Sequence, residues 1–259
     1  MSGANLSGAR LEGADLYRSD LSKALLSGAD VAHADLTSAD LSGAVLYGAR
    51  LAGATLAGAS LRNARAVGAW FRAADLSEAD VRGALLTGAD MASANLRLAR
   101  LDRVRLGGAD LTQADLGGAA LRDAHLFRAR LIRARLTGTR LAGSDMTSAQ
   151  MREADLREAT LVQACLFAAD LSGADLTGAD LSGAVLARAV LTRARLTRAV
   201  LAEVDLQAAR TMGADLSGAD LRGADLSATG LRRDGVTQRF PDAIHDRSTR
   251  WDDAPASAQ

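Results

Sequence analysis

The chain has 259 residues, of which 48% are hydrophobic and 3% aromatic, and its 31 basic and 31 acidic residues give a formal net charge of zero. This balance argues against a generally basic nucleic-acid-binding protein. A single cysteine, Cys165, excludes an internal disulfide and is typical of a reducing compartment. No apolar run is long enough to span a membrane and no signal peptide is recognised, so we expect a cytoplasmic protein without membrane contact.

From Leu6 to Leu231 the sequence repeats every five residues. Leu occupies 38 of the 46 central positions, and Ala stands two residues earlier in 40 of the 46 repeats. On an α-helix a period of five turns the chain by about 500°, which scatters the leucines around the cylinder. In a straight strand an odd period places successive leucines on opposite faces. The chain must therefore bend inside each repeat.

The segment Ala174–Gly178 (ADLTG) shows how one repeat works. Ala174 and Leu176 are two residues apart, so a short extended segment points both side chains inward, while Asp175 and Thr177 point outward. Gly178 supplies a turn because glycine tolerates backbone angles that other residues avoid. Each repeat is then one side of a polygonal coil, and such coils stack into a solenoid.

At these positions the sequence resembles the pentapeptide-repeat family, whose consensus is A-[DN]-L-x-x. The resemblance implies an all-β fold, a right-handed, four-sided parallel β-helix with twenty residues per coil. Residues 1–231 would then form about eleven to twelve coils, and at about 4.8 Å per coil a rod about 55 Å long. Residues 232–259 would form a short C-terminal cap or tail, with its last residues, Ala254–Gln259, disordered.

Two central residues of one coil differ from leucine in side-chain size, one smaller and one larger. Ala66 is the smallest central residue, and Phe71, the next one along the chain, is the largest. Because protein cores are close-packed, the small residue is predicted to make room for the large one. A degenerate repeat is the alternative interpretation.

The sequence gives no sign of catalysis, metal binding or a cofactor. Cys165 precedes a central leucine and should point outward, and the three histidines, His33, His125 and His245, are scattered along the chain. A catalytic site needs a nucleophile, a base and an orienting group that converge on one cavity, and a metal site needs clustered ligands. We therefore expect no enzyme activity, no metal site and no cofactor.

One face of the predicted rod is rich in apolar outward positions. If residues twenty apart stack, the face centred on Leu6, Leu26 and Leu46 presents the candidate interaction residues Leu25, Val45, Tyr47, Val67, Leu85, Phe127, Phe167 and Val185. A monomer rarely exposes such a strip without a partner, although branched and aromatic residues also suit strands for structural reasons. This face is the predicted site for a protein partner.

Within the family that the chain resembles, the best-characterised members protect DNA gyrase and carry an acidic surface similar to DNA. Sustained negative charge of that kind is absent here because the middle of the chain is basic, around Arg97–Arg105 and Arg128–Arg140. A shorter acidic surface remains near the C-terminal end, at Asp175, Asp180, Asp205, Asp215, Asp220 and Asp225. The repeat phase never slips, so no inserted loop like those of some gyrase-protecting members is expected.

The tail after Leu231 has both prolines and no five-residue register. Its segment Gly235–Asp242 resembles the closing segments of pentapeptide-repeat proteins, and the end of a β-helix is an open sheet edge that proteins cover. We expect Phe240 to cover the last coil and Trp251 to pack beside it or on a second subunit. The alternative role for both residues is dimerisation.

These observations favour a non-catalytic scaffold or protein-interaction module that acts through rigid rod surfaces. The alternative is a DNA-mimic-type protein that binds gyrase, a type II topoisomerase, and protects it from quinolones or toxins. We expect a homodimer, formed through the C-terminal end or a side face. Nucleic-acid binding is disfavoured because the basic clusters lack interleaved exposed aromatic residues.

Overall fold

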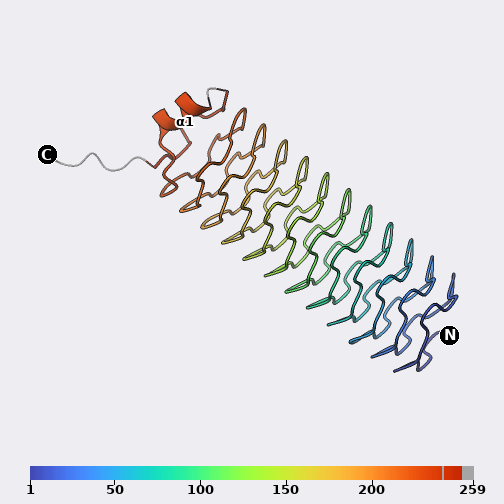
Figure 1. Ribbon diagram of the computed structural model, residues 1–259. Coiled ribbons are helices and arrows are strands. Elements are labelled where there is room, and N and C mark those ends of the chain that lie inside the picture. The colour runs from blue at the N-terminus through green and yellow to red at the C-terminus, as the bar shows by residue number, and fades with distance from the viewer. Residues whose placement is uncertain (241, 253–259) are drawn as a thin grey trace.

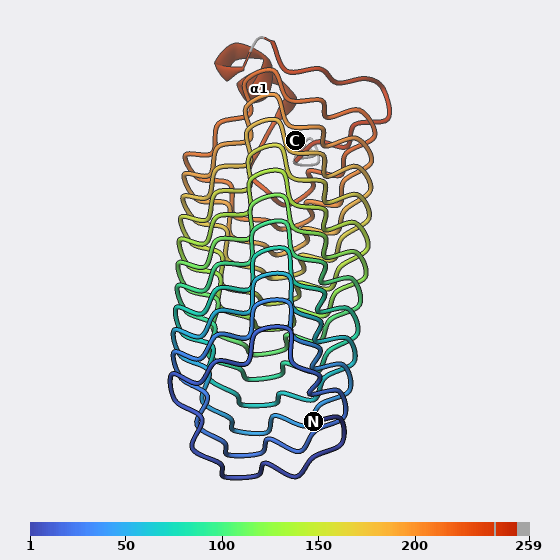
Figure 2. The same cartoon turned by 90° about the vertical axis from the view of Figure 1, so that its right-hand side faces the viewer.

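The computed structural model describes residues 1–240 and 242–252 and forms one elongated stack of coils (Figure 1). The N-terminus lies at one end of the stack, and helix α1 (Arg233–Arg239) lies at the other. Turned by 90°, the same coils lie above one another at an even spacing (Figure 2). The predicted all-β solenoid is confirmed as the architecture of the repeats.

The coils are held together by parallel bridges between residues twenty positions apart. The bridges begin at Asn5 with Leu25 and continue to Asp205 with Asp225. Each coil therefore takes twenty residues and contains four pentapeptides. In the described residues no strand extends beyond a single bridged position, because each pentapeptide spends two of its five residues on a turn.

The repeat Ala174–Gly178 illustrates the hydrogen bonds that build a coil. The Asp175 N–H donates to the Ala154 carbonyl of the preceding coil at 2.9 Å, and the Leu176 N–H donates to the Arg195 carbonyl of the following coil at 2.7 Å. The turn closes where the Ala179 N–H donates to the Leu176 carbonyl at 3.0 Å. Backbone groups are thus paired both between coils and at each corner.

Gly178 occupies the corner with φ of 68°, in the left-handed region that favours glycine. The same corner is not restricted to glycine, since Arg103 adopts φ of 60° at the equivalent position of another repeat. The turn therefore follows from the spacing of the repeat as a whole.

The inward Ala and Leu positions form one continuous core along the axis. Ala174 and Leu176 are fully buried, and so are Ala66 and Phe71, the pair with complementary sizes. The core continues into the C-terminal segment through Val236 of α1 and through Phe240.

Part of the tail continues the stack beyond the last regular repeat. Ile244 bridges with Asp220, and Arg250 bridges with Asp225. Thr249 takes the buried place of the repeat alanine, and its hydroxyl donates to the Leu221 carbonyl at 2.9 Å. The five-residue register is absent from the tail, as expected, yet its backbone pairs with the rod. The prediction of disorder for Ala254–Gln259 lies outside the described residues.

Candidate interaction surfaces

The predicted apolar strip lies on one face of the rod. The position before each central leucine on this face forms a single ladder, in which Leu25 bridges Val45 and Cys165 bridges Val185. Leu25, Val67, Phe127, Phe167 and Val185 are exposed, with Leu25 and Val67 both 41% exposed. Val45, Tyr47 and Leu85 are half-buried. All eight side chains predicted for this face therefore reach the surface at least in part.

The strip is divided into two patches by polar residues. Between Leu85 and Cys165 the ladder passes through Arg105, His125 and Asp145. We call the first group the N-terminal patch, which consists of Leu25, Val45, Tyr47, Val67 and Leu85. We call the second group the C-terminal patch, which consists of Phe127, Cys165, Phe167 and Val185.

Arginine side chains lie over the aromatic rings of both patches. The Arg65 guanidinium lies 5.3 Å from the centre of the Tyr47 ring, and Arg128 lies 4.8 Å from that of Phe127. Arg188 lies 5.8 Å from the Phe167 ring. Cation–π contacts of this kind contribute about 0.5–1 kcal/mol at exposed sites and hold the cation close to the apolar surface.

The candidate acidic residues near the C-terminal end lie on three different ladders. Asp175 and Asp215 share one ladder with Arg195 between them, while Asp180 and Asp220 share a second with Val200 between them. The third ladder brings Asp205 directly beside Asp225. The acidic residues thus surround the rod and do not form one continuous face.

These carboxylates also have structural roles within the repeat. Each of the six accepts a hydrogen bond from the backbone N–H two residues later, at 2.9–3.1 Å. The hydrogen bond from the Ser217 side chain lowers the pKa of Asp215, and the one from Arg222 lowers that of Asp220. Burial raises the pKa of Asp225, but the hydrogen bonds from Ser227 outweigh it and the pKa is lowered.

Ion pairs neutralise part of this acidic surface. Arg195 pairs with Asp175 at 3.8 Å and Arg250 with Asp225 at 3.3 Å. Asp220 is paired with Arg222 at 2.5 Å. The remaining three, Asp180, Asp205 and Asp215, have no salt bridge within the part of the chain that the structure describes.

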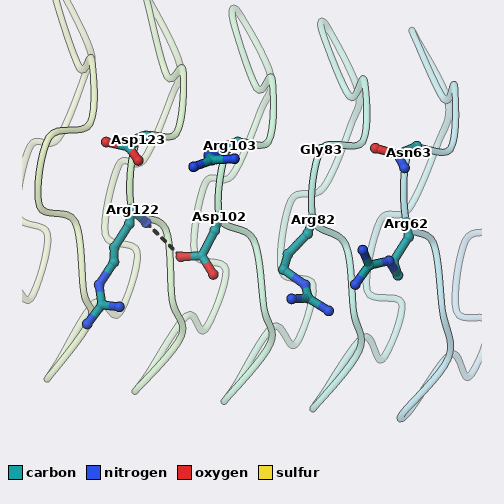
Figure 3. A pocket seen from close by; sticks show the side chains of 8 residues that line it. All are labelled: Arg62, Asn63, Arg82, Gly83, Asp102, Arg103, Arg122 and Asp123. Carbon is teal, nitrogen blue, oxygen red and sulfur yellow. Dashed lines mark hydrogen bonds between the residues drawn. The ribbon is translucent and has the colours of Figure 1, made fainter.

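A hollow of about 400 Å³ lies on another face, in the basic middle of the rod (Figure 3). Two neighbouring ladders of turn residues on successive coils line this hollow. The first consists of Arg62, Arg82, Asp102 and Arg122, and the second of Asn63, Gly83, Arg103 and Asp123. Asp102 accepts a hydrogen bond from the Arg122 backbone N–H at 3.1 Å. The hydrogen bond that the Arg82 side chain donates to the adjoining Asp80 lowers the pKa of that carboxyl group. The hollow is open and of mixed charge.

Cys165 is half-buried, and its Sγ lies 3.2 Å from the Thr147 hydroxyl. His125 lies two coils away on the same ladder, about 9.6 Å along the axis, which exceeds hydrogen-bond reach. Among residues 1–240 and 242–252, no three His, Cys, Asp or Glu side chains are arranged to hold a metal ion. No helix in those ranges is long and apolar enough to cross a bilayer.

The two residues predicted for the cap lie at the C-terminal end of the core. Phe240 is buried, and the half-buried Trp251 packs against the core cluster. The His245 and Trp251 rings meet edge to face, with their centres 5.2 Å apart. A role of Phe240 or Trp251 in dimerisation stays a prediction.

Leu98 and Met212 are exposed apolar side chains outside the strip that were not singled out from the sequence. Leu98 is 55% exposed and Met212 is 78% exposed, each on a different face from the strip. Both stand at outward positions one or two residues after a central residue. The same position count that defined the strip could therefore have found them.

The family model of the pentapeptide repeats matches the chain in eight copies, which cover residues 1–37, 39–77, 69–108, 105–141, 124–166, 169–207 and 199–233, some of them overlapping. The comparison with curated proteins gave no match. Among solved structures, HetL, a pentapeptide repeat protein involved in heterocyst differentiation regulation in the cyanobacterium Nostoc sp. strain PCC 7120, is 32% identical. The match covers 85% of this chain and 90% of HetL, with a TM-score of 0.42.

Two further solved structures are similar to the chain. A pentapeptide repeat protein from the thylakoid lumen of Arabidopsis thaliana is 28% identical over 45% of this chain and 86% of its own, with a TM-score of 0.33. QnrB1, a plasmid-mediated fluoroquinolone resistance protein, is 18% identical over 95% of this chain and 91% of its own, with a TM-score of 0.23. Since the family profile spans most of the rod, the chain belongs to the pentapeptide repeat family.

Proposed function

We propose that the chain is a non-catalytic scaffold that binds a protein partner through the N-terminal patch. The observation that carries this proposal is the exposure of Leu25 and Val67, both 41%, on one face with three further apolar side chains. An apolar surface of this kind is favourable to cover, at about 25 cal/mol for each Å² removed from water. Protein interfaces commonly combine such an apolar centre with a polar rim.

The row of turn residues that follows Tyr47 and Val67 supports the proposal because it consists of glycines without side chains. Gly28, Gly48, Gly68 and Gly88 follow one another there, and a Cβ added at any of them would meet no atom within 4 Å. A partner can therefore approach the patch without obstruction from that row. Arg65, held over the Tyr47 ring, would supply the polar rim.

The test compares binding partners of the intact protein and a Leu25→Ser/Val67→Ser variant. Leu98→Ser is the matched control, because Leu98 is also exposed but lies on another face. Proteins captured by the wild type and by the control, and lost from the double variant, are then measured directly for affinity. We expect at least about tenfold weaker binding by the double variant. If every captured protein binds all three equally, the N-terminal patch is not the site.

Protection of a topoisomerase is the second candidate function, favoured by the acidic residues near the C-terminal end. Its support is limited because those carboxylates lie on three ladders and are partly ion-paired. A gyrase supercoiling assay with and without a quinolone tests it. Loss of an effect on changing Asp215, Asp220 and Asp225 to Asn would support this function, and no effect of the wild-type protein would exclude it.

Asparagine is a suitable replacement in this assay because it can still accept the turn hydrogen bond. Asn5 and Asn95 do so in their own repeats, at 3.1 and 3.2 Å. The change therefore removes charge and preserves the turn. The right-handed, four-sided form with eleven to twelve coils, implied by the family, is the shape that we propose for either function.

A further inference from the structure

The face that carries the C-terminal patch has an unusual order of charges. Over the seven coils from Arg105 to Asp225, its outward charged residues are Arg105, then Arg128, then Asp145, then none in the coil of Cys165 and Phe167, then Arg188, Asp205 and Asp225. Beyond these coils the same ladder continues to Arg65 on one side and to Arg250 on the other. The signs therefore read plus, plus, minus, neutral, plus, minus, minus. Reading the series backward inverts every sign, so the charge order is antisymmetric about the coil of Phe167.

An antisymmetric series of charges is what a two-fold symmetric, antiparallel pair of rods requires. In such a pair, each coil lying before the axis faces the coil at the same distance beyond the axis on the other copy. With the axis at the coil of Phe167, Asp145 lies opposite Arg188 and Arg128 lies opposite Asp205. The outermost pair is Arg105 with Asp225, and His125 also comes opposite Asp205.

Each of these three charge pairs occurs twice in the assembly, because the interface is the same seen from either copy. Complementary charges of this kind steer association and select the register of an interface.

Shifts by half a coil or one coil introduce like-charge contacts. Moving the axis by half a coil toward the N-terminus brings Arg128 opposite Arg188. Moving it by half a coil the other way brings Asp145 opposite Asp205. An axis at the coil of Asp145 places that residue opposite its own copy. Since like charges disfavour association, the charge series selects against these displaced positions of the two-fold axis.

Most charges on this face form no salt bridge within the part of the chain that the structure describes. Fourteen salt bridges are formed between described residues, and none involves Arg105, Arg128, Asp145, Arg188 or Asp205. The exception is Asp225, which pairs with Arg250 at 3.3 Å. Elsewhere on the rod, arginines such as Arg130 and Arg152 pair with an aspartate of a neighbouring coil.

The centre of the series is apolar. Phe167 is 37% exposed and Cys165 is half-buried beside it, with Val185 on the next coil. A two-fold axis here brings Phe167 against its own copy and leaves the charges around it as a polar border. This is the arrangement of an apolar interface centre with a polar rim.

The spacing of the charges indicates that the partner bound to this face is another rod of stacked coils. Successive coils rise by about 4.8 Å, so the coils of Arg105 and Asp225 are six steps, or about 29 Å, apart. A partner must repeat at the same rise to keep all pairs in register over that length. A second copy of this chain does so by construction and also carries the inverted charge series.

We propose that the C-terminal patch is a self-association surface, through which two copies of the chain pair side by side and antiparallel with the two-fold axis at the coil of Cys165 and Phe167. Leu25, Val45, Tyr47 and Val67 of the N-terminal patch lie outside the overlap and stay free, whereas the coil of Leu85 comes opposite Arg250. The inference is therefore independent of the function proposed above.

The test uses Cys165, the only cysteine of the chain, as a reporter of register. In the proposed pair, Cys165 of each copy faces the other across the axis, separated by about the 10 Å between two packed sheet faces. A short bismaleimide, which spans that distance between two thiols, should therefore join two copies of the full-length protein into a covalent dimer. An antiparallel register displaced by one and a half coils also avoids like-charge contacts, but there the two cysteines are also displaced by about 14 Å along the rods, beyond the reach of the short cross-linker.

Charge reversal tests the pairing itself. Arg128→Glu and Asp205→Arg should each weaken the dimer by at least about tenfold, and the double variant should recover most of the wild-type affinity. Glutamate is tolerated at the repeat position of Arg128, as at Glu153, and Arg105 shows that arginine is tolerated on the ladder of Asp205. Arg198→Glu, at the same repeat position on another face, is the control and should leave the dimer unchanged.

Analytical ultracentrifugation of the four variants and the wild type measures the dissociation constants. A dimer that cross-links through Cys165 and follows the reversal and rescue supports the proposal. A monomer at concentrations up to about 0.1 mM overturns it. So does a dimer that fails to cross-link, or one in which Arg128→Glu has no more effect than the control.

Discussion

The complementary sizes of Ala66 and Phe71 lead to a quantitative prediction about the core. Both side chains are fully buried, and Phe71 is the largest fully buried side chain among the described residues. Phe71→Leu removes packed volume and should lower the free energy of unfolding by about 1 kcal/mol. Ala66→Leu adds volume to a filled layer and should lower it by about 1–3 kcal/mol.

The double variant should be more stable than the sum of the two costs predicts. It converts these two adjacent sides of the coil into the Leu–Leu pair found in the preceding coil at Leu46 and Leu51, both fully buried. We therefore expect it within about 1 kcal/mol of the wild type, which corresponds to a coupling energy of about 1–3 kcal/mol.

Urea unfolding followed by circular dichroism measures the four free energies of this cycle. Trp70, exposed and next to Phe71 in the sequence, gives a local fluorescence signal for the same region. Phe71→Leu combined with Leu171→Val is the control, because the two sites are five coils apart and their costs should add. Additive costs for Ala66→Leu and Phe71→Leu would refute the idea that the two residues share one space.

Three further predictions concern the turns and the C-terminal end. Hydrogen bonds from the Ser217 and Arg222 side chains lower the pKa of Asp215 and Asp220, respectively. The stability that these two carboxylates contribute is therefore complete above the unfolded-state pKa of about 3.9 and is lost as the pH falls through the lower folded-state pKa. A melting temperature that does not fall between pH 5 and pH 2 would contradict this. Asp40 accepts the Ser42 N–H at 2.8 Å, so Asp40→Ala should cost about 1 kcal/mol and Asp40→Asn much less, as judged by urea midpoints. Phe240→Ala should cost about 3 kcal/mol and speed amide exchange in residues 242–252 before the central coils; equal exchange along the rod would show that Phe240 does not secure that end.

The stacked coils were predictable from the sequence because the repeat is short and never changes phase. A period of five is incompatible with an amphipathic helix or a flat strand, so the spacing of Ala174 and Leu176 already requires a bent, stacked chain. The burial of both residues follows directly. The exposed apolar strip was predictable for the same reason, once residues twenty apart were assumed to stack.

The environment of the acidic residues was not predictable in the same way. The sequence analysis grouped Asp175, Asp205 and Asp220 as one C-terminal acidic region, although the twenty-residue period places them on three different ladders, as the bridges show. Each carboxylate also accepts a backbone N–H from its own turn, which composition and charge alone do not reveal.

By itself, the sequence determined the solenoid, its inward and outward positions and the continuous aliphatic core, because these depend on interactions inside a five-residue unit that is repeated without interruption. Only the tertiary structure decided how the tail joins the rod, since Ile244 and Arg250 pair with coils far back in the chain through backbone bonds that need no repeat. It also showed that some arginines pair within their own repeat, as Arg222 does with Asp220, which the twenty-residue period alone does not indicate.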